Sequence, residues 1–317
     1  MGLLLVFDRV SKTYRVGLLG RKVIRAVQGV SFEIHSGEVV SLVGESGSGK
    51  TTIGKMILRL IPVTSGKIFF QGVDIATLQG EALKGYYQKV QGVFQDPYSS
   101  CNPIFKADRI FWIIRDEFFP KVSTIEWARK VNKTLEAVGL NPEHVLSKFP
   151  HQLSGGQLQR FLIARALLLN IELLVADEII SMLDASTRVD VLNLLAGLKA
   201  QGLSLLFITH DLSLGYYISD WSVILYGGRI VEQGVTERVY HRPLHPYTRM
   251  LMNSVPRLDK KWERGTGIYG IDQQSGGGGC VYYGRCPIAK KSTSCACEEQ
   301  VLVEVEQGHF VACTQWQ

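Results

Sequence analysis

The sequence of 317 residues lacks a long hydrophobic run. Its most apolar stretch, FLIARALLLNIELLVAD at 161–177, is interrupted by Arg165, Asn170 and Glu172, and a membrane-spanning helix needs about 18 or more apolar residues in succession. The opening MGLLLVFD is too short for the apolar part of a signal peptide and has no basic residues in front of it. We therefore expect a cytoplasmic protein that does not span a membrane by itself.

Charge of one sign is not gathered anywhere in the sequence. A formal net charge of +6 is compatible with a nucleic acid or an anionic membrane surface as partner, but the charged residues are scattered, which favours a solvated surface and no nucleic-acid partner. Short strands alternate with helical patterns, which predicts an α/β fold, and Gly227 and Gly228 predict the turn of a hairpin. The length indicates one large domain with an appendage.

One stretch, GESGSGKTT at 44–52, combines glycines with a lysine and hydroxyl groups. It fits the pattern G-x-x-x-x-G-K-[ST], in which backbone N–H groups surround a polyphosphate, the lysine adds positive charge and a threonine can ligate Mg²⁺. An apolar strand precedes it and a helical pattern follows, so a helix N-terminus would point at the anion. A plain flexible turn is the weaker alternative. The predicted nucleotide-binding residues are Gly44, Glu45, Ser46, Gly47, Ser48, Gly49, Lys50, Thr51 and Thr52.

The stretch LLVADE at 173–178 predicts a short buried strand that ends in two carboxylates. Asp177 at the strand end could hold Mg²⁺ together with Thr51. Glu178 could polarise the attacking water as a general base. Adjacent acidic residues more often form a solvated helix cap, but this pair follows a strand in a chain that already has a phosphate-binding loop.

A second phosphate-binding element is predicted at the start of a helix, in QLSGGQLQRF at 152–161. Ser154, Gly155, Gly156 and Gln157 offer a hydroxyl, free N–H groups and the positive end of the helix dipole. The element lies about a hundred residues after the first one. One ATP could use both only if it lay between two copies of the fold.

In this order, the motifs resemble those of the ATP-binding subunits of ABC transporters, whose signature sequence is LSGGQ. The resemblance covers about residues 1–255. It implies that Tyr14 stacks on adenine, that Gln95 contacts Mg²⁺, that Asp184 in SMLD lies in a loop contacting the opposite subunit, and that His210 lies near the γ-phosphate. The implied catalytic residues are Lys50, Glu178 and His210.

The resemblance also implies the fold and its division. Residues 1–255 would form a P-loop NTPase cassette with a RecA-like core, an antiparallel β subdomain and a helical insertion at about 98–170. Residues 256–317 would form a small C-terminal extension that carries the cysteines, and their concentration there marks a separate unit. Two cassettes would close head to tail around ATP and reopen after hydrolysis.

A narrower resemblance points to the dipeptide/oligopeptide/nickel permease branch, and to the second of its paired ATP-binding subunits. It rests on GLLGRKVIRAVQGVSFEI, FQDPYSSCNP and YHRPLHPYTRMLMNSVP. The implied partners are a similar cassette as heterodimer, two transmembrane permease subunits and an extracellular or periplasmic solute-binding protein, with this chain on the cytoplasmic face of the membrane. The alternatives are a soluble ABC ATPase that acts on nucleic acid or ribosomes, and an iron- or redox-regulated ATPase module.

The chain departs from the family pattern at four positions near these motifs. Ile179 replaces a proline, Met182 an alanine, Leu158 an arginine and Cys101 a leucine. Losing the proline after Glu178 removes a fixed φ and could loosen that turn. Both carboxylates are retained, so we expect a competent ATPase site.

Five of the six cysteines lie in the last forty residues or so. Cytoplasmic proteins seldom keep structural disulfides, so clustered cysteines suggest a metal. Zinc sites favour closer pairs, whereas iron–sulfur clusters take four thiolates with looser spacing. Members of the permease branch carry a similar four-cysteine extension, which implies a [4Fe–4S] cluster here; zinc or free thiols remain alternatives. The implied ligands are Cys280, Cys286, Cys297 and Cys313, with Cys295 as the alternative third ligand.

Overall fold

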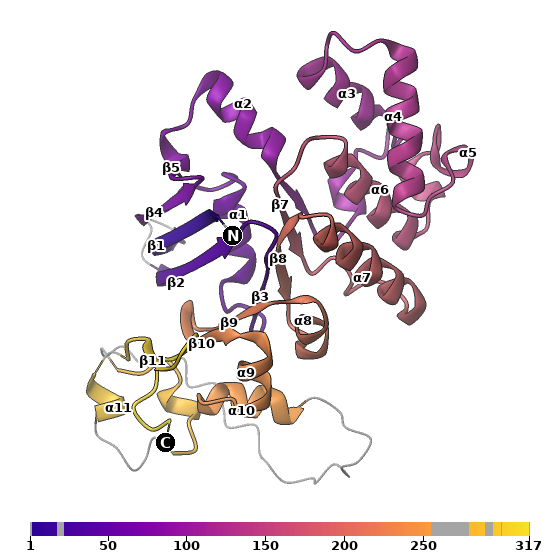
Figure 1. Cartoon of the computed structure of the whole chain (residues 1–317). Coiled ribbons are helices and arrows are strands. Elements are labelled where there is room, and N and C mark those ends of the chain that lie inside the picture. The colour runs from indigo at the N-terminus through magenta and orange to yellow at the C-terminus, as the bar shows by residue number, and fades with distance from the viewer. Residues whose placement is uncertain (1, 18–21, 255–278, 289–293, 299, 317) are drawn as a thin grey trace.

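Two β-sheets and a group of helices make up the described part of the chain, with the larger sheet at the centre (Figure 1). The computed structural model describes residues 2–17, 22–254, 279–288, 294–298 and 300–316. The α/β architecture confirms the fold expected from the sequence.

The larger sheet has eight strands in the order β11-β12-β10-β9-β3-β8-β7-β6. Strands β6, β7, β8, β3 and β9 run parallel to one another, and β10, β12 and β11 are added antiparallel. The parallel strands are mostly apolar because both faces of this part of the sheet are covered. The bounds are β3 Val39–Val43, β6 Val90–Val93, β7 Leu173–Asp177, β8 Ser204–Thr209, β9 Trp221–Tyr226, β10 Arg229–Val235, β11 Val303–Glu306 and β12 His309–Val311.

Alternate residues of each parallel strand face two different hydrophobic cores. In β7, Leu173 and Val175 pack into the core that contains Ile53 of α1, whereas Leu174 and Ala176 pack into the core shared with α6 and α7. In Figure 1, α1 accordingly lies to the left of β7 and β8, and α6 and α7 lie to their right. Apart from the insertion and the C-terminal extension, the α-helices are α1 Lys50–Ile57, α2 Gly80–Lys89, α7 Ala185–Ala200, α8 Leu212–Ile218, α9 Thr236–His241 and α10 Pro246–Ser254.

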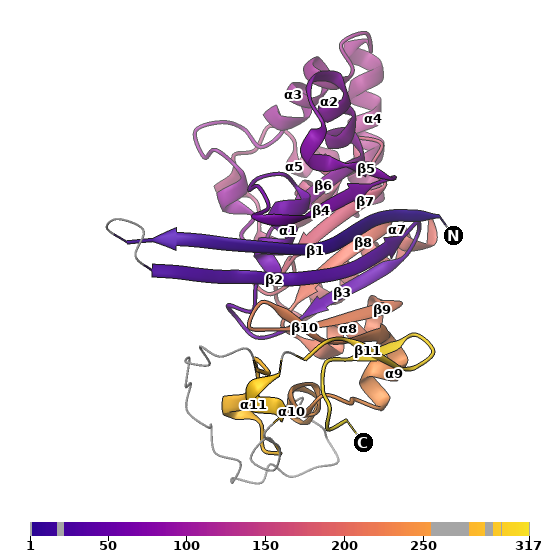
Figure 2. The same ribbon diagram turned by 90° about the vertical axis from the view of Figure 1, so that its left-hand side faces the viewer.

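The smaller sheet is the antiparallel β subdomain expected from the sequence. Its strand order is β2-β1-β4-β5, and Figure 2 shows the long β1 and β2 side by side across the molecule. Phe7 and Phe32 stack on its inner face with ring centroids 4.5 Å apart, and both belong to the core that also contains α1. The bounds are β1 Leu3–Val16, β2 Lys22–His35, β4 Ser65–Phe70 and β5 Val73–Asp74, followed by a short 3-10 helix, η2 Ile75–Thr77.

A helical insertion separates β6 from β7 in sequence, as predicted. Ser123 caps its longest helix, accepting a hydrogen bond from the backbone N–H of Glu126, whose side chain reaches back to Ser123. Phe111 and Phe161 stack with centroids 4.4 Å apart and join α3 to α6. The elements are η3 Tyr98–Ser100, α3 Arg109–Phe118, α4 Thr124–Ala137, α5 Pro142–Val145, η4 Pro150–Gln152 and α6 Gly155–Leu167.

The C-terminal extension adds two strands to the large sheet. Strand β12 pairs with β10, placing Val311 opposite Glu232, and β11 pairs with β12. The remaining elements are η5 Tyr283–Arg285 and α11 Ser294–Cys297. The division predicted at residues 255 and 256 lies at the edge of a segment outside the described residues. Among the helices that are described, none has the length and apolar character needed to cross a membrane.

Candidate nucleotide site and cysteine-lined cavity

Four of the predicted functional segments follow the carboxyl ends of four adjacent parallel strands. The glycine-rich loop follows β3, Gln95 follows β6, Asp177 and Glu178 lie at the end of β7, and His210 follows β8. Neighbouring parallel strands end at the same edge of a sheet, which is where ligands bind in open α/β folds. The sheet order therefore gathers residues that are far apart in the sequence.

The glycine-rich loop is held tightly between neighbouring backbone segments. A Cβ added to Gly44 would lie 2.2 Å from the carbonyl oxygen of Leu225, and one added to Gly49 would lie 2.3 Å from that of Ala26. Gly49 also has a φ of 106°, a conformation that side chains other than glycine rarely adopt. These two glycines are required by the path of the loop. All nine predicted residues of 44–52 lie in this loop and the first turn of α1.

Lys50 begins α1 and is almost completely buried. Its ammonium group donates to the backbone oxygens of Gly44 at 2.7 Å and Glu45 at 3.0 Å. Burial lowers the pKa of Lys50, and the carboxylates of Glu178, Asp177 and Glu45 oppose that shift. The side chain is thus placed under the loop, ready to add positive charge to a phosphate.

Thr51 and Asp177, the two strongest candidates for Mg²⁺ ligation, are brought into contact. The Thr51 hydroxyl donates to Asp177 Oδ1 at 3.3 Å. Burial raises the pKa of the Asp177 carboxyl, the hydrogen bond from Thr51 opposes this, and Glu178 adds to it. A hydroxyl and a buried carboxylate suit Mg²⁺, which prefers oxygen ligands and usually retains waters and phosphate oxygens.

Glu178 and His210, two of the residues expected to be catalytic, lie in contact with each other. His210 Nδ1 lies 3.3 Å from Glu178 Oε2, and the Glu178 side chain is only 19% exposed. Glu178 has a φ of 51°, an uncommon value for a residue other than glycine. Its backbone N–H is fixed by the carbonyl of Ile208 at 2.9 Å. The end of β7 thus holds its second carboxylate in a strained conformation, a feature common at functional sites.

Gln95 and Tyr14 occupy more open positions. Gln95 is exposed on the loop after β6. Tyr14 is half-buried on β1, opposite Ile24 of β2, and the ammonium group of Lys12 lies 5.2 Å from its ring centroid. Among the interactions described, neither residue contacts the group formed by the buried Lys50 and Asp177 and the exposed Thr51.

The second phosphate-binding element forms the N-terminus of α6. Ser154 is the N-cap: its Oγ accepts from the N–H of Gln157 at 3.2 Å, and the Gln157 side chain accepts from the N–H of Ser154 at 2.9 Å. A Cβ on Gly156 would lie 2.3 Å from Cγ2 of Thr187, whereas one on Gly155 would meet nothing closer than 3.9 Å. The second glycine therefore allows α6 to approach the start of α7.

Asp184 lies beside this element as the N-cap of α7. Its carboxylate accepts from Ser186 Oγ at 2.6 Å, from the N–H of Thr187 at 3.0 Å and from Thr187 Oγ1 at 2.8 Å. These hydrogen bonds hold the pKa of Asp184 well below its usual range. Thr187 bonds Asp184 and lies close to Gly156, so it connects the SMLD loop to the N-terminus of α6.

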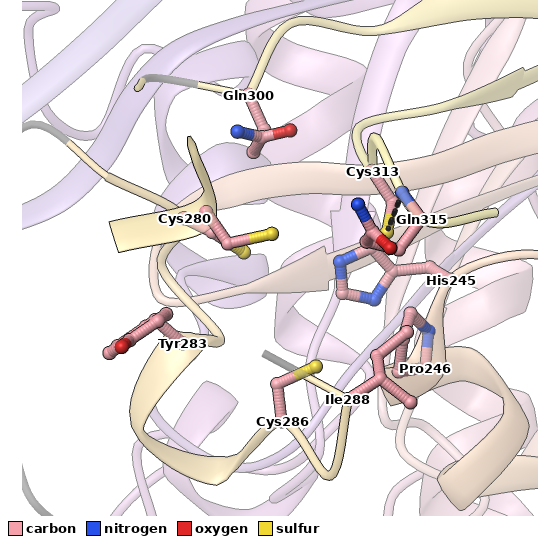
Figure 3. Close-up of a pocket in the computed structure, with 10 residues that line it drawn as sticks. His245, Pro246, Cys280, Tyr283, Cys286, Ile288, Gln300, Cys313 and Gln315 are labelled. Atoms are coloured by element: carbon pink, nitrogen blue, oxygen red, sulfur yellow. Dashed lines mark hydrogen bonds between the residues drawn. The ribbon is translucent and has the colours of Figure 1, made fainter. Parts of the chain in front are cut away.

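Four of the six cysteines line a single cavity in the extension. Cys280, Cys286, Cys295 and Cys313 lie around it together with His245 (Figure 3). Burial raises the pKa of Cys280 and of Cys313, and the neighbouring thiols of this group add to the increase. Among the described residues, no group of three or more His, Cys, Asp or Glu side chains is arranged to hold a metal ion.

Cys297, the preferred third ligand in the sequence-based expectation, lies outside this cavity. It is exposed, whereas Cys295 is buried and lines the cavity. The two residues belong to the one-turn helix α11. Residues two apart on a helix point about 200° away from each other, so only one of them can face the other thiols. The structure places the alternative, Cys295, in that position.

Sequence reasoning missed two residues that hold the glycine-rich loop from outside. Tyr247 Oη accepts from the backbone N–H of Glu45 at 2.9 Å, and Arg285 donates to both carboxylate oxygens of Glu45 at 2.7 and 3.1 Å. Arg285 comes directly before Cys286. No short-range sequence pattern links Glu45 to Tyr247 or Arg285, because they are so far apart in the chain. The position of Arg285 beside Cys286 was the one sequence feature that could have drawn attention to it.

The fold and this set of residues define a P-loop nucleotide hydrolase. Comparison with known proteins narrows the class: residues 27–181 match the family model described as ABC transporter, and residues 231–295 match the model described as oligopeptide/dipeptide transporter, C-terminal region.

Individual relatives agree with the family models. The chain is 43% identical over 296 residues to a putative peptide import ATP-binding protein of Brucella ovis, covering 92% of each chain. It is 40% identical over 310 residues to the oligopeptide transport ATP-binding protein OppF of Streptococcus mutans, covering 96% of this chain and 93% of that one. The chain therefore belongs to the ATP-binding subunits of ABC transporters, in the oligopeptide/dipeptide branch, and is an ABC-type ATPase.

Solved structures support the same assignment. The described fold is similar to a dimeric post-hydrolysis state of the ATP-binding cassette MJ0796 bound to ADP and phosphate. The identity is 28%, the TM-score is 0.66, and the match covers 74% of this chain and 99% of that one. That relative shows that cassettes of this kind dimerise with nucleotide products bound.

Proposed function

We propose that this chain is the ATP-hydrolysing subunit of an importer for peptides or a related solute. The contact between Thr51 and Asp177 carries the proposal, because it joins the phosphate-binding loop to the strand-end carboxylate that Mg²⁺ requires. The family match of residues 231–295 supports the transport branch over a soluble ATPase that acts on nucleic acid or ribosomes. The names of the relatives support peptides as cargo.

Within one chain, different residues would bind the phosphates, hold Mg²⁺ and activate the attacking water. Lys50 offers positive charge beneath the loop, and Thr51, Asp177 and Gln95 would hold Mg²⁺. Bound Mg²⁺ supplies charge neutralisation of the phosphates. Glu178 would orient and polarise the attacking water. His210, 3.3 Å from the Glu178 carboxylate, would hold that carboxylate in place and add a polar group near the γ-phosphate.

A second chain completes the site. Ser154, Gly155, Gly156 and Gln157 begin a helix in the insertion, on the other side of β7 and β8 from α1 (Figure 1). In a head-to-tail dimer this helix N-terminus would face the triphosphate held by the partner's loop, and Asp184 would contact the partner. The proposed partner is a similar, non-identical cassette. Two transmembrane permease subunits and a solute-binding protein would complete the assembly on the cytoplasmic face of the membrane.

The test compares two glutamate variants in the assembled transporter. Glu178→Gln should reduce ATP hydrolysis by about 10²–10⁴-fold, the usual contribution of a general base, while ATP binding is retained. Glu172→Gln is the matched control, because Glu172 pairs with Lys89 on the surface, and its variant should hydrolyse ATP normally. Unchanged turnover in Glu178→Gln would contradict the catalytic role, and failure to co-purify with two polytopic membrane proteins would contradict the transport role.

We also propose that the cysteine-lined cavity binds a [4Fe–4S] cluster through Cys280, Cys286, Cys295 and Cys313. Four thiols around one cavity match the ligand set of such clusters. The cluster is wider than a single ion, so its thiolates need not converge on one point. Two serine variants give the test: after anaerobic purification, Cys295→Ser should lose iron and colour, and Cys297→Ser should keep both. Equal iron content in the two variants, or none in the unmodified protein, would overturn the assignment.

A further inference from the structure

Glu45, the second residue of the phosphate-binding loop, is held at three separate points. Its carbonyl accepts from the ammonium group of Lys50, its N–H donates to Tyr247 Oη, and its carboxylate accepts from both terminal nitrogens of Arg285. Tyr247 belongs to α10 and Arg285 to the extension, 240 positions away from Glu45. Two of these three contacts therefore come from parts of the chain outside the nucleotide-binding loop.

Arg285 is in turn fixed by the turn that carries two of the cavity thiols. Tyr283 N–H donates to the carbonyl of Cys280 at 3.0 Å, and Cys286 N–H donates to that of Tyr283 at 3.2 Å. The guanidinium lies 5.7 Å from the ring centroid of Tyr226 and 5.9 Å from that of Tyr282. Its side chain is 22% exposed, so the pair with Glu45 is partly shielded from water.

The geometry points to Arg285 as a positioning residue of the nucleotide site, linking the thiol-lined cavity to the phosphate-binding loop. This inference rests on the proposed ATPase function. Arg285 neutralises the Glu45 carboxylate, which would otherwise repel the triphosphate that enters the same loop. It also steadies the Glu45 backbone, whose carbonyl orients Lys50. The packing around Cys280 and Cys286 thereby affects how tightly ATP binds.

The first measurement is the dissociation constant of ATP for the full-length chain, by calorimetry. Arg285→Ala should weaken binding by about two- to five-fold, as expected for losing a partly exposed charge pair. Arg285→Lys should recover part of the loss, because lysine restores the charge without the two-pronged geometry. Arg242→Ala is the matched control: it breaks another ion pair between cassette and extension, with Glu306, and should leave ATP binding unchanged. Thermal unfolding of each variant separates a local effect from misfolding.

Two double variants test whether Arg285 acts on ATP binding through Glu45, and whether Cys286 acts through Arg285. In the Glu45→Gln background, Arg285→Ala should cause no further loss of ATP affinity, because its charged partner is gone. Cys286→Ser should change ATP affinity in the otherwise unmodified chain and have no effect in the Arg285→Ala background. Additive effects in either pair would overturn the proposed link. High salt should shrink the difference between the unmodified chain and Arg285→Ala.

The outcomes separate this inference from the proposed function. If the unmodified chain binds ATP and Arg285→Ala binds it equally well, the positioning role is wrong and the ATPase proposal stands. If the unmodified chain does not bind ATP at all, the proposed function itself fails.

Discussion

The hydroxyl of Thr51 donates a hydrogen bond to the carboxylate of Asp177 at 3.3 Å, although the two residues are 126 positions apart. The contact exists because β7 and β3 are separated only by β8 in the sheet, so their carboxyl ends lie close together. It joins the loop that receives the phosphates to the carboxylate that would hold the metal.

Replacing Thr51 by valine should remove one metal-binding oxygen without changing the shape of the side chain. We expect the Mg²⁺ concentration that gives half-maximal ATP hydrolysis to rise several-fold, and the maximal rate to fall. Thr51→Ser keeps the hydroxyl and serves as the control, with a nearly unchanged Mg²⁺ requirement. A titration of ATPase activity against Mg²⁺ checks both variants, and identical curves for valine and serine would exclude the ligand role.

Gly156→Ala should destabilise the fold by about 1–3 kcal/mol, the usual cost of overfilling a packed contact. The added methyl would lie 2.3 Å from Cγ2 of Thr187. Gly155→Ala, whose Cβ has room, should unfold at nearly the same urea concentration as the unmodified protein. Adding Thr187→Ser to Gly156→Ala removes the clashing methyl and keeps the hydroxyl that bonds Asp184, so it should restore stability. Without such rescue the clash is not the cause.

The buried pair of Glu232 and His309 should control how firmly the extension is attached. His309 Nε2 lies 2.8 Å from Glu232 Oε1, both side chains are fully buried, and the same carboxylate accepts from the N–H groups of Leu244 and His245. Glu232→Ala leaves these groups without an acceptor and should cost about 3–5 kcal/mol. Limited proteolysis and urea unfolding measure the loss.

The exposed pair of Arg242 and Glu306 provides the comparison for that prediction. It also joins the cassette to the extension, but its side chains are 67% and 39% exposed. Arg242→Ala should therefore change the free energy of unfolding by no more than about 1 kcal/mol. Equal losses for Glu232→Ala and Arg242→Ala would mean that burial of the first pair does not matter.

Lowering the pH should reduce the free energy of unfolding, because His245 is protonated in the unfolded chain. Burial lowers the pKa of His245 from 6.5 to about 3, and its Nδ1 accepts a hydrogen bond from the N–H of Tyr247. The unfolded chain binds this proton below pH 6.5 and the folded chain does not, so the stabilisation is complete above pH 6.5. It is lost as the pH falls towards 3, by about 2 kcal/mol at pH 5. His245→Asn should remove this part of the pH dependence, measured by urea unfolding at pH 7.5 and pH 5. If His245→Asn loses as much stability between pH 7.5 and pH 5 as the unmodified protein, the pH dependence comes from other groups.

Much of the nucleotide site could be predicted because its residues lie next to strong local signals. The loop at 44–52, the carboxylates after β7 and the capped start of α6 each depend on a few adjacent residues. The turn at Gly227 and Gly228 is another example: both residues have positive φ values, of 55° and 81°, as a tight hairpin requires.

The rest depended on contacts that leave no local pattern. The close approach of Gly156 to Thr187 joins distant segments, and so does the ion pair of Arg285 with Glu45. The choice between Cys295 and Cys297 depended on which side of one helical turn faces the cavity. Cysteine spacing could not reveal it, since both residues fit the spacing almost equally well.

The addition of β12 to β10 has a consequence for any shortened form of this chain. Without residues 300–316, β10 would become the outermost strand of the large sheet, and the backbone groups that now pair Glu232 with Val311 and Gly234 with His309 would lose their partners. An uncovered edge of this kind readily pairs with strands of other molecules. A cassette cut before β11 would therefore tend to self-associate and aggregate, even with every residue of its nucleotide site intact.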